Sequence, residues 1–274
     1  MVKSKLEDIE LQLLIEGIYR HYGYDFREYA PTSLKRRILN FIQTENLNSI
    51  SGLQEKVLHD HETMKRLMLA ILVHVTEMFR DPSFYLTFRR RVIPMLRLHP
   101  YIRIWHAGCS TGEEVYSLAI LLQEEKLYKR CRIYATDVSD AVLQKAKSGR
   151  FPMQLMRDFT RNYVRAGGKQ AFSEYYTVKD DVAIFKPELI ENITFSRHNL
   201  VTDTSFNEFN VIFCRNVLIY FNRSLQTRVH NLIYESLAMS GTLALGRSEM
   251  VRFSPHENDY EPFEPSEKLF YKVR

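Results

Sequence analysis

The chain has 274 residues, 45% of them hydrophobic and 26% charged, which is typical of a globular protein with one large domain or two smaller ones. No apolar run approaches the ~20 residues of a membrane span, and the first residues lack the apolar core of a secretion signal. The three cysteines show no Cys-x-x-Cys spacing. We therefore expect a cytoplasmic protein with reduced thiols, no bound metal and no membrane insertion.

The net charge of +5 is unevenly distributed. Residues 82–112 contain no acid but include five arginines, at positions 89, 90, 91, 97 and 103. A second basic group, Lys35, Arg36 and Arg37, lies on a predicted helix near the N-terminus. Such patches favour an acidic partner, either nucleic acid or an acidic protein, although a solvated helix face accounts for each group taken alone.

The first 75 residues predict an all-helical domain. One apolar stripe comprises Leu6, Ile9, Leu13 and Tyr19. Thr32 and Ser33 offer N-caps for a helix after Pro31, and its predicted buried face comprises Leu34, Ile38, Phe41 and Ile42. Apolar residues near 53–58 and 67–72 predict two more helices, and a further helix at roughly 82–98 follows.

From residue 102 onward, the pattern alternates between strand and helix. Strands are predicted at 102–107, 131–136, 193–198, 209–214 and 242–246, and the last predicted helix covers 223–239. This alternation predicts a mostly parallel, doubly wound sheet whose ligands bind at the carboxyl ends of the strands. Two short alternating runs, 173–178 and 181–185, predict a hairpin in a small antiparallel insertion.

A glycine turn joins the first predicted strand to its helix. Gly108 and Gly112 bracket the turn with a Gly-x-x-x-Gly spacing that differs from the dinucleotide fingerprint, and no Lys follows as in a P-loop. Glu113 and Glu114 would repel a pyrophosphate at this helix N-terminus. A zwitterionic, sulfonium-bearing cofactor such as S-adenosylmethionine fits better than NAD, although the two acids also simply offset the helix dipole.

Polar residues follow the later strands at the same predicted edge. Asp137 ends the second strand, where a carboxylate can bind two ribose hydroxyls or cap the next helix. Asn199 and Leu200 follow the third strand and could frame an adenine, or form an ordinary loop. Arg215 and Asn216 interrupt an apolar run after the fourth strand, so they require a polar partner.

Two absences weigh against nucleic-acid methylation. The chain has neither the Asp/Asn-Pro-Pro-Tyr motif expected for transfer to an exocyclic base nitrogen nor a Pro-Cys nucleophile for pyrimidine carbon methylation.

Tyr220 lies about one helical turn beyond the fourth strand and could face the same pocket, or be a half-buried aromatic.

Several longer motifs occur in order along the chain. They are Thr76-Glu-Met-Phe-Arg-Asp81, Ala107-Gly-Cys-Ser-Thr-Gly-Glu-Glu114, Ala135-Thr-Asp137, Ala146-Lys-Ser-Gly149 and Phe213-Cys-Arg-Asn-Val-Leu-Ile-Tyr-Phe221. Together they resemble the motifs of the chemotaxis receptor glutamate methyltransferases (CheR), and Gly246-Arg-Ser-Glu249 is similar to the Gly-His-Ser-Glu of that family. The resemblance implies a helical domain at 1–75, a linker helix at 76–98, and a class I methyltransferase domain at 99–274 with a β-subdomain insertion at about 168–192.

The resemblance also implies a site for S-adenosylmethionine, with S-adenosylhomocysteine as its product. The implied contacts are His74, Thr76, Arg80, Gly108, Glu113, Glu114, Asp137, Asn199, Leu200, Arg215 and Asn216. His74 stands where the family often has Asn, and either of the two glutamates could be the direct ligand. Arg80 and Tyr220 are placed nearest the methyl group and the incoming carboxylate.

The implied reaction is methylation of glutamate side chains on the cytoplasmic helices of chemoreceptors for sensory adaptation. A glutamate with a pKa of about 4.3 is already ionised at neutral pH, so no general base is needed. Lys35, Arg36 and Arg37 would dock the acidic receptor helix, and the β-subdomain could hold a receptor tail peptide. We expect a monomer that does not act on nucleic acid; the alternatives are a non-catalytic S-adenosylmethionine sensor and an RNA methyltransferase.

Overall fold

A computed structural model describes residues 2–72, 76–264 and 266–274, in two compact units. One unit contains the N-terminal residues together with 219–228, and the other contains the remainder of the chain up to its C-terminus. His74, a predicted cofactor contact, lies outside the described residues.

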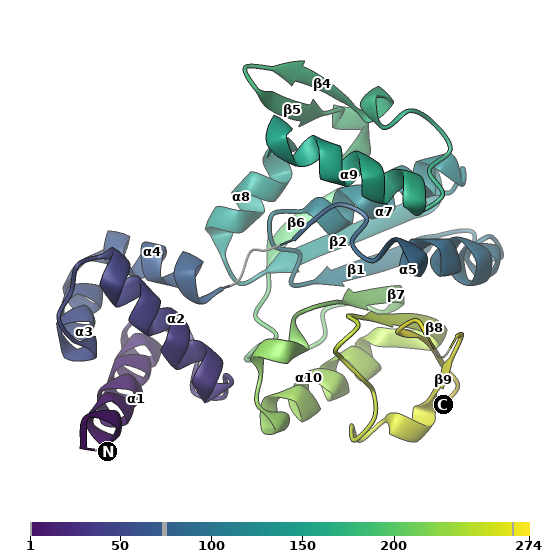
Figure 1. The fold of residues 1–274 in the computed structure, drawn as a ribbon. Coiled ribbons are helices and arrows are strands. Elements are labelled where there is room, and N and C mark those ends of the chain that lie inside the picture. Colours follow the sequence, from purple (N-terminus) through teal and green to yellow (C-terminus); the bar gives the residue numbers. More distant parts are fainter. Residues whose placement is uncertain (1, 73–75, 265) are drawn as a thin grey trace. The chain divides into compact units, whose positions relative to one another are not determined.

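The first unit is helical, as expected. Its N-terminal part consists of α1 (Val2–Tyr22), α2 (Pro31–Thr44), α3 (Ile50–His59) and α4 (His61–Ile71), which Figure 1 shows in purple and blue. The predicted stripe on α1 is wrong, because Leu6, Ile9 and Leu13 are each more than half exposed. The face that packs inward comprises Leu11, Leu14 and Ile18. Both faces of α1 carry aliphatic residues at helical spacing, so spacing alone does not identify the buried one.

The starts of these helices follow capping chemistry with one exception. Ser49 and Asp60 cap α3 and α4, accepting bonds from the backbone N–H of Gly52 and of Glu62 and Thr63. The prediction that Thr32 or Ser33 caps α2 is wrong, because the helix begins at Pro31 with Ala30 in the cap position. The fixed φ of proline suits the first helical position. The predicted inner face of α2 is confirmed: Leu34, Ile38, Phe41 and Ile42 are buried.

The second unit is built on a seven-stranded sheet in the order β6-β2-β1-β7-β8-β10-β9. Its parallel part consists of β1 (Ile102–Ala107), β2 (Cys131–Asp137), β6 (Ile193–Arg197), β7 (Phe209–Cys214) and β8 (Leu237–Leu245). The antiparallel pairs involve β9 (Tyr260–Pro262) and β10 (Leu269–Lys272), which the sequence pattern did not predict. The mostly parallel, doubly wound sheet is confirmed, and its strand order reverses between β1 and β7. Ligands of such sheets bind at that reversal, beyond the carboxyl ends of the strands.

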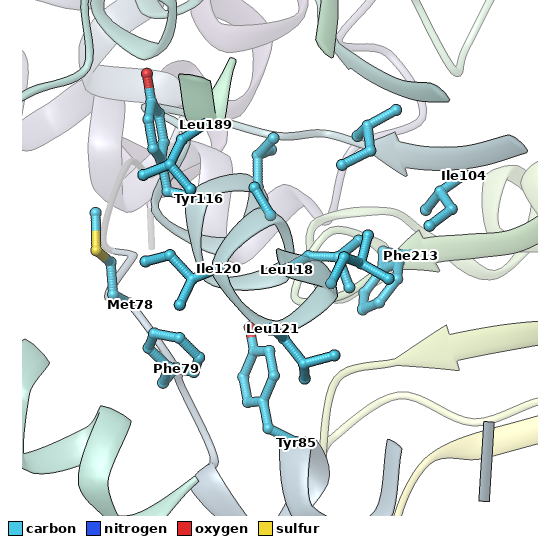
Figure 2. Close-up of a cluster of buried hydrophobic side chains, with 14 of the residues drawn as sticks. Met78, Phe79, Tyr85, Ile104, Tyr116, Leu118, Ile120, Leu121, Leu189 and Phe213 are labelled. Atoms are coloured by element: carbon cyan, nitrogen blue, oxygen red, sulfur yellow. The ribbon is translucent and has the colours of Figure 1, made fainter. Parts of the chain in front are cut away.

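The helices of the sheet region are α7 (Glu113–Glu124), α8 (Asp140–Ser148) and α10 (Arg223–Ser236). The last is shorter than the predicted 223–239 because β8 already begins at Leu237. Every residue of α7 from Val115 to Leu122 is buried. Figure 2 shows its side chains packed among Met78, Phe79, Tyr85, Ile104 and Phe213. A helix buried on all sides fixes the position of its own N-terminus, where Glu113 and Glu114 lie.

The predicted helix at 82–98 forms three short segments: α5 (Pro82–Thr87), a π-helical turn (Phe88–Val92) and α6 (Ile93–Leu96). The predicted hairpin is also present, as β4 (Tyr176–Lys179) and β5 (Val182–Phe185). A third strand, β3 (Arg150–Pro152), pairs with β5, so the small sheet starts earlier in the chain than residue 168. Figure 1 shows this sheet beside α9 (Met153–Arg165).

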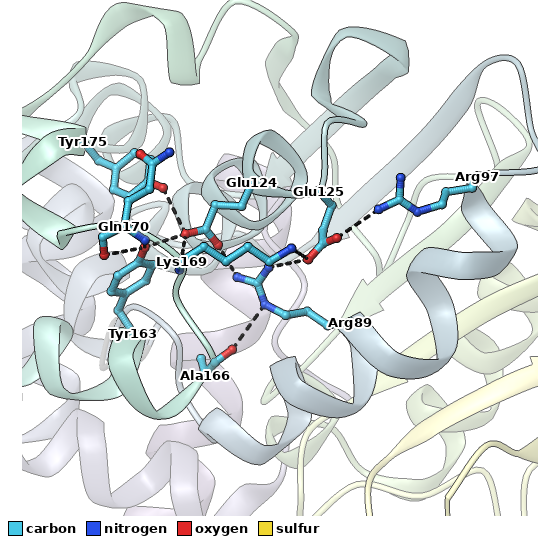
Figure 3. A network of polar contacts seen from close by, with 9 residues as sticks. All are labelled: Arg89, Arg97, Glu124, Glu125, Tyr163, Ala166, Lys169, Gln170 and Tyr175. Atoms are coloured by element: carbon cyan, nitrogen blue, oxygen red, sulfur yellow. Dashed lines mark hydrogen bonds and ion pairs between the residues drawn. The ribbon is translucent and has the colours of Figure 1, made fainter.

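A buried ionic network joins the π-helical turn, the end of α7 and the segment after α9 (Figure 3). Arg89 pairs with Glu124 and, at 2.8 Å, with Glu125, and its Nε donates to the carbonyl of Ala166. The Glu124 side chain is only 1% exposed and also accepts from the Tyr163 and Tyr175 hydroxyls. These contacts attach the inserted segment to α7.

Removing Arg89 should therefore destabilise the second unit strongly. Breaking a buried ion pair from one side typically costs about 3–5 kcal/mol, and because Glu124 keeps its tyrosine donors we expect about 3 kcal/mol for Arg89→Ala. The loss in free energy of unfolding is measured by urea titration monitored by circular dichroism. The control is Arg90→Ala: Arg90 is exposed and pairs with Glu264, so a cost of no more than about 1 kcal/mol is expected. Equal costs for the two variants would contradict a structural role for the network.

Candidate active site

The loop between β1 and α7 is held against the end of β2. The N–H groups of Gly108 and Cys109 both donate to the carbonyl of Thr136, at 2.9 and 2.8 Å. Gly108 has φ +76°, and a Cβ added there would lie 2.7 Å from Cγ2 of Val217. Ser110 and Gly112 also have positive φ, at 50° and 95°. Glycine at 108 therefore suits both the backbone conformation and the close packing of this loop, where most side chains would not fit.

Asp137 lies at the carboxyl end of β2, next to this loop. One of its oxygens accepts from the Ser110 N–H at 2.9 Å and the other from the Ser139 N–H at 3.1 Å. Burial raises the pKa of this carboxyl. A carboxylate offers about four acceptor positions, so both oxygens keep capacity for the hydroxyls of a ligand.

Glu114 is engaged within the protein. Its Oε1 lies 2.5 Å from Nη1 of Arg215, and its Oε2 lies 3.6 Å from Nδ1 of His106. The other terminal nitrogen of Arg215 lies 2.9 Å from Oδ2 of Asp81, and its guanidinium covers the ring of Phe84. Burial opposes the ionisation of Glu114, but the charge of Arg215, with His106, holds its pKa at about 2. Glu114 is therefore a charged partner of a buried arginine.

Glu113 has a different environment. Its side chain is buried, and both of its oxygens accept from the hydroxyl of Thr111, at 2.9 and 2.7 Å. Burial raises the pKa of Glu113 to about 7. No ion pair to Glu113 is present in the described ranges of the chain.

Asn216 lies in the loop after β7 in a left-handed conformation, with φ 60°. Glu249 holds this loop, because its carboxylate accepts from the N–H groups of Asn216, Val217 and Leu218 at 2.7–2.8 Å. The N–H of Gly246 donates to the same carboxylate at 2.6 Å. Glu249 and Asp81 both belong to the recognised motifs but were not predicted as site residues; only their place in those motifs could have indicated them.

The segment that contains Thr76 and Arg80, both half-buried, is fixed by its neighbours. The amide of Asn162 donates to the Glu77 carboxylate and to the Met78 carbonyl, and the N–H of Phe79 donates to Oγ of Ser117.

Beyond β6, the N–H of His198 donates to the carbonyl of Asp137, which brings the following Asn199 and buried Leu200 to the same edge. The side-chain oxygen of Asn199 accepts from the Val201 N–H.

The remaining predicted residues belong to the first unit. The Tyr220 carbonyl accepts from Ala30 N–H, and its ring lies 4.6 Å from the Arg37 guanidinium. Lys35 pairs with Glu7 and Asp8, at 3.1 and 2.7 Å, and Arg37 donates to the carbonyl of Ile71. Of the three basic residues, Arg36 is the exposed one.

The chain belongs to the CheR methyltransferase family. The SAM binding domain of that family matches residues 74–268, and its all-alpha domain matches residues 9–72. The chain is therefore an S-adenosylmethionine-dependent methyltransferase with the class I fold and an N-terminal all-alpha domain.

The individual relatives agree with this assignment. The protein Cher3 of Pseudomonas putida, described provisionally as a methyltransferase, is 47% identical over 99% of this chain and 100% of its own length. A chemotaxis protein methyltransferase of Listeria innocua is 32% identical over 85% of this chain and 87% of its own. An uncharacterised 104.1 kDa protein of Rhodobacter capsulatus is 29% identical over 82% of this chain, which spans only 24% of that protein.

Two features are absent from the described part of the chain. None of its helices combines the length and apolarity needed to cross a bilayer. No group of three or more His, Cys, Asp or Glu side chains within it is arranged to hold a metal ion.

The Gly108 turn gives a direct test of this loop geometry. Gly108→Ala places a residue with a Cβ in a positive-φ conformation, which costs about 1–3 kcal/mol. The added Cβ also clashes with Val217, whose branched side chain is stiff. We expect the free energy of unfolding to fall accordingly in urea titrations. The double variant with Val217→Ala should recover part of the loss, because only the clash is relieved. Absence of any recovery would contradict the described contact.

Proposed function

We propose that this methyltransferase esterifies glutamate side chains on chemotaxis receptors, with S-adenosylmethionine as the methyl donor. The similarity to chemotaxis protein methyltransferases supports the receptor substrate. The observation that supports binding of the donor most directly is at the start of α7, where Glu114 is paired with an arginine and Glu113 is not. Asp137, with spare acceptor capacity at the end of β2, is proposed to bind the ribose hydroxyls.

Glu113 is the better candidate for the direct ligand of the donor. Glu114 already has the charge of Arg215 at 2.5 Å, whereas Glu113 has uncharged donors within the described residues, the Thr111 hydroxyl and its own backbone N–H. A cationic ligand group near Glu113 would satisfy a buried carboxylate that is otherwise costly to ionise. We therefore assign Glu113 to the positively charged end of the donor and Glu114 to the support of Arg215.

Methyl transfer to a carboxylate depends more on positioning the two reactants than on acid–base catalysis. When bound, the donor supplies an electrophilic methyl group on a sulfonium. The glutamate nucleophile is ionised at neutral pH, so no residue of this chain has to remove a proton. The task of the chain is to orient the two reactants and exclude water. The segment containing Thr76 and Arg80 is proposed to line the site on this account, and Tyr220 remains a predicted neighbour of the carboxylate.

An acidic receptor helix remains the proposed protein substrate. Steering of such a helix by the N-terminal basic residues should depend mainly on Arg36, because Lys35 and Arg37 are engaged within the unit. A basic surface for RNA has weaker support: Arg89 and Arg97 pair with Glu125, and Arg103 donates to Asn207. Binding of a receptor tail at the small sheet stays a prediction.

The proposal is tested by incubating the full chain with radiolabelled donor and receptor-containing membranes. The expected result is label on the receptor that is released as methanol in mild base, as a carboxyl methyl ester requires. Asp137→Asn should lower the rate at least tenfold, because one ribose acceptor is replaced by a donor. Donor binding without any transfer would contradict the proposal and favour a sensor role.

The assignment of Glu113 predicts a pH dependence. With its pKa raised to about 7, Glu113 is mostly protonated below that pH and must lose its proton to pair with a cation. Donor affinity should therefore rise between pH 5.5 and 7, with proton release detectable by calorimetry in buffers of different ionisation enthalpy. Glu113→Gln should bind more weakly and with little pH dependence over this range. An unchanged pH profile in that variant would contradict the assignment.

A further inference from the structure

A chain of alternating charges leads from the surface to the start of α7. Nε of Arg247 lies 3.0 Å from Oδ1 of Asp81, whose Oδ2 lies 2.9 Å from Arg215. Arg215 in turn lies 2.5 Å from Glu114. The inner arginine side chain is 1% exposed, whereas that of Arg247 is 63% exposed.

The outer and inner arginines of this row of charges differ in how firmly they are held. Asp81 is fixed in a left-handed conformation before α5, and its carbonyl accepts from the Phe84 N–H. The side chain of Arg247 has, besides Asp81, a 3.2 Å bond to Oγ of Ser83. Exposed ion pairs are weak and exchange readily, whereas the buried pair of Arg215 is screened from solvent. An incoming carboxylate can therefore replace Asp81 as the partner of Arg247 without disturbing Arg215.

The backbone of Arg247 is nevertheless well placed. It follows Gly246, whose N–H donates to the same Glu249 carboxylate that holds the loop of Asn216. Its ion-pair partner, Asp81, follows Arg80 directly in the chain. An exposed guanidinium thus lies beside both segments to which the site was assigned.

We propose that Arg247 binds a carboxylate of the protein substrate and positions the substrate at the site. This inference rests on the proposed function, since it presumes an acidic protein substrate. The planar guanidinium of arginine matches a carboxylate with two parallel hydrogen bonds and stays charged at all working pH values. The family motif has His at this position, so the substrate contact in this chain does not depend on a proton.

The test compares steady-state methylation of receptor membranes by Arg247→Gln and by Arg252→Gln. Arg252 is an exposed arginine on the same loop, so the control removes the same charge from nearby surface. We expect Arg247→Gln to raise KM for the receptor about tenfold, with the donor Kd from calorimetry unchanged, and Arg252→Gln to change KM less than twofold. An unchanged KM, equal effects of both variants, or a weakened donor Kd in Arg247→Gln would each overturn the inference.

Arg247→His adds a readout that a structural role would not give. Since an unperturbed His has a pKa near 6.5, this variant should retain a low receptor KM at pH 6 and lose it by pH 8, relative to the unsubstituted chain. An identical KM profile in the two proteins would overturn the inference. If the unsubstituted chain forms no methyl ester at all, the proposed function itself fails, and that result is distinct from a failure of Arg247.

Discussion

The arrangement of the site depends on a buried guanidinium, that of Arg215, and on the two carboxylates that neutralise it. Glu114 from α7 and Asp81 from the segment before α5 meet at this one side chain, so three parts of the chain are tied together at the carboxyl edge of the sheet. A buried charge without partners is costly, so any displacement of these segments carries a large penalty. The proposed site is therefore preorganised by electrostatics as well as by packing.

This interaction also explains why two adjacent glutamates have opposite properties. Successive residues at a helix start point in different directions, so Arg215 reaches Glu114 and not Glu113. Burial then acts on both, but of the two only Glu114 receives a compensating charge from the described residues, and the pKa values separate to about 2 and about 7. Glu113 becomes the acid with unused capacity for a cation.

The architecture was predicted correctly from the sequence where hydrophobic periodicity and motif agreed. The parallel strands and the glycine turn followed from apolar runs bounded by polar residues, since these report burial directly. The prediction failed where one pattern fits two structures: α1 is aliphatic on two faces, and β9 is too short to show alternation. At the site, the residue types were predictable, but the pairing of Arg215 with Glu114 and Asp81 was not, because these residues are about a hundred or more positions apart in the chain. The role of Glu249 as an acceptor of four backbone N–H groups was likewise beyond any local pattern.

The most direct measurement compares thermal stability and donor affinity in Glu113→Gln and Glu114→Gln at pH 7.5. Glu113→Gln should melt at the same temperature or higher, because a buried acid that resists ionisation is removed, while its affinity for S-adenosylmethionine falls. Glu114→Gln should melt clearly lower, because Arg215 loses a charged partner. If instead the Glu113 variant is the destabilised one, or the Glu114 variant keeps its stability and alone loses the donor, the two glutamates have been assigned in the wrong order.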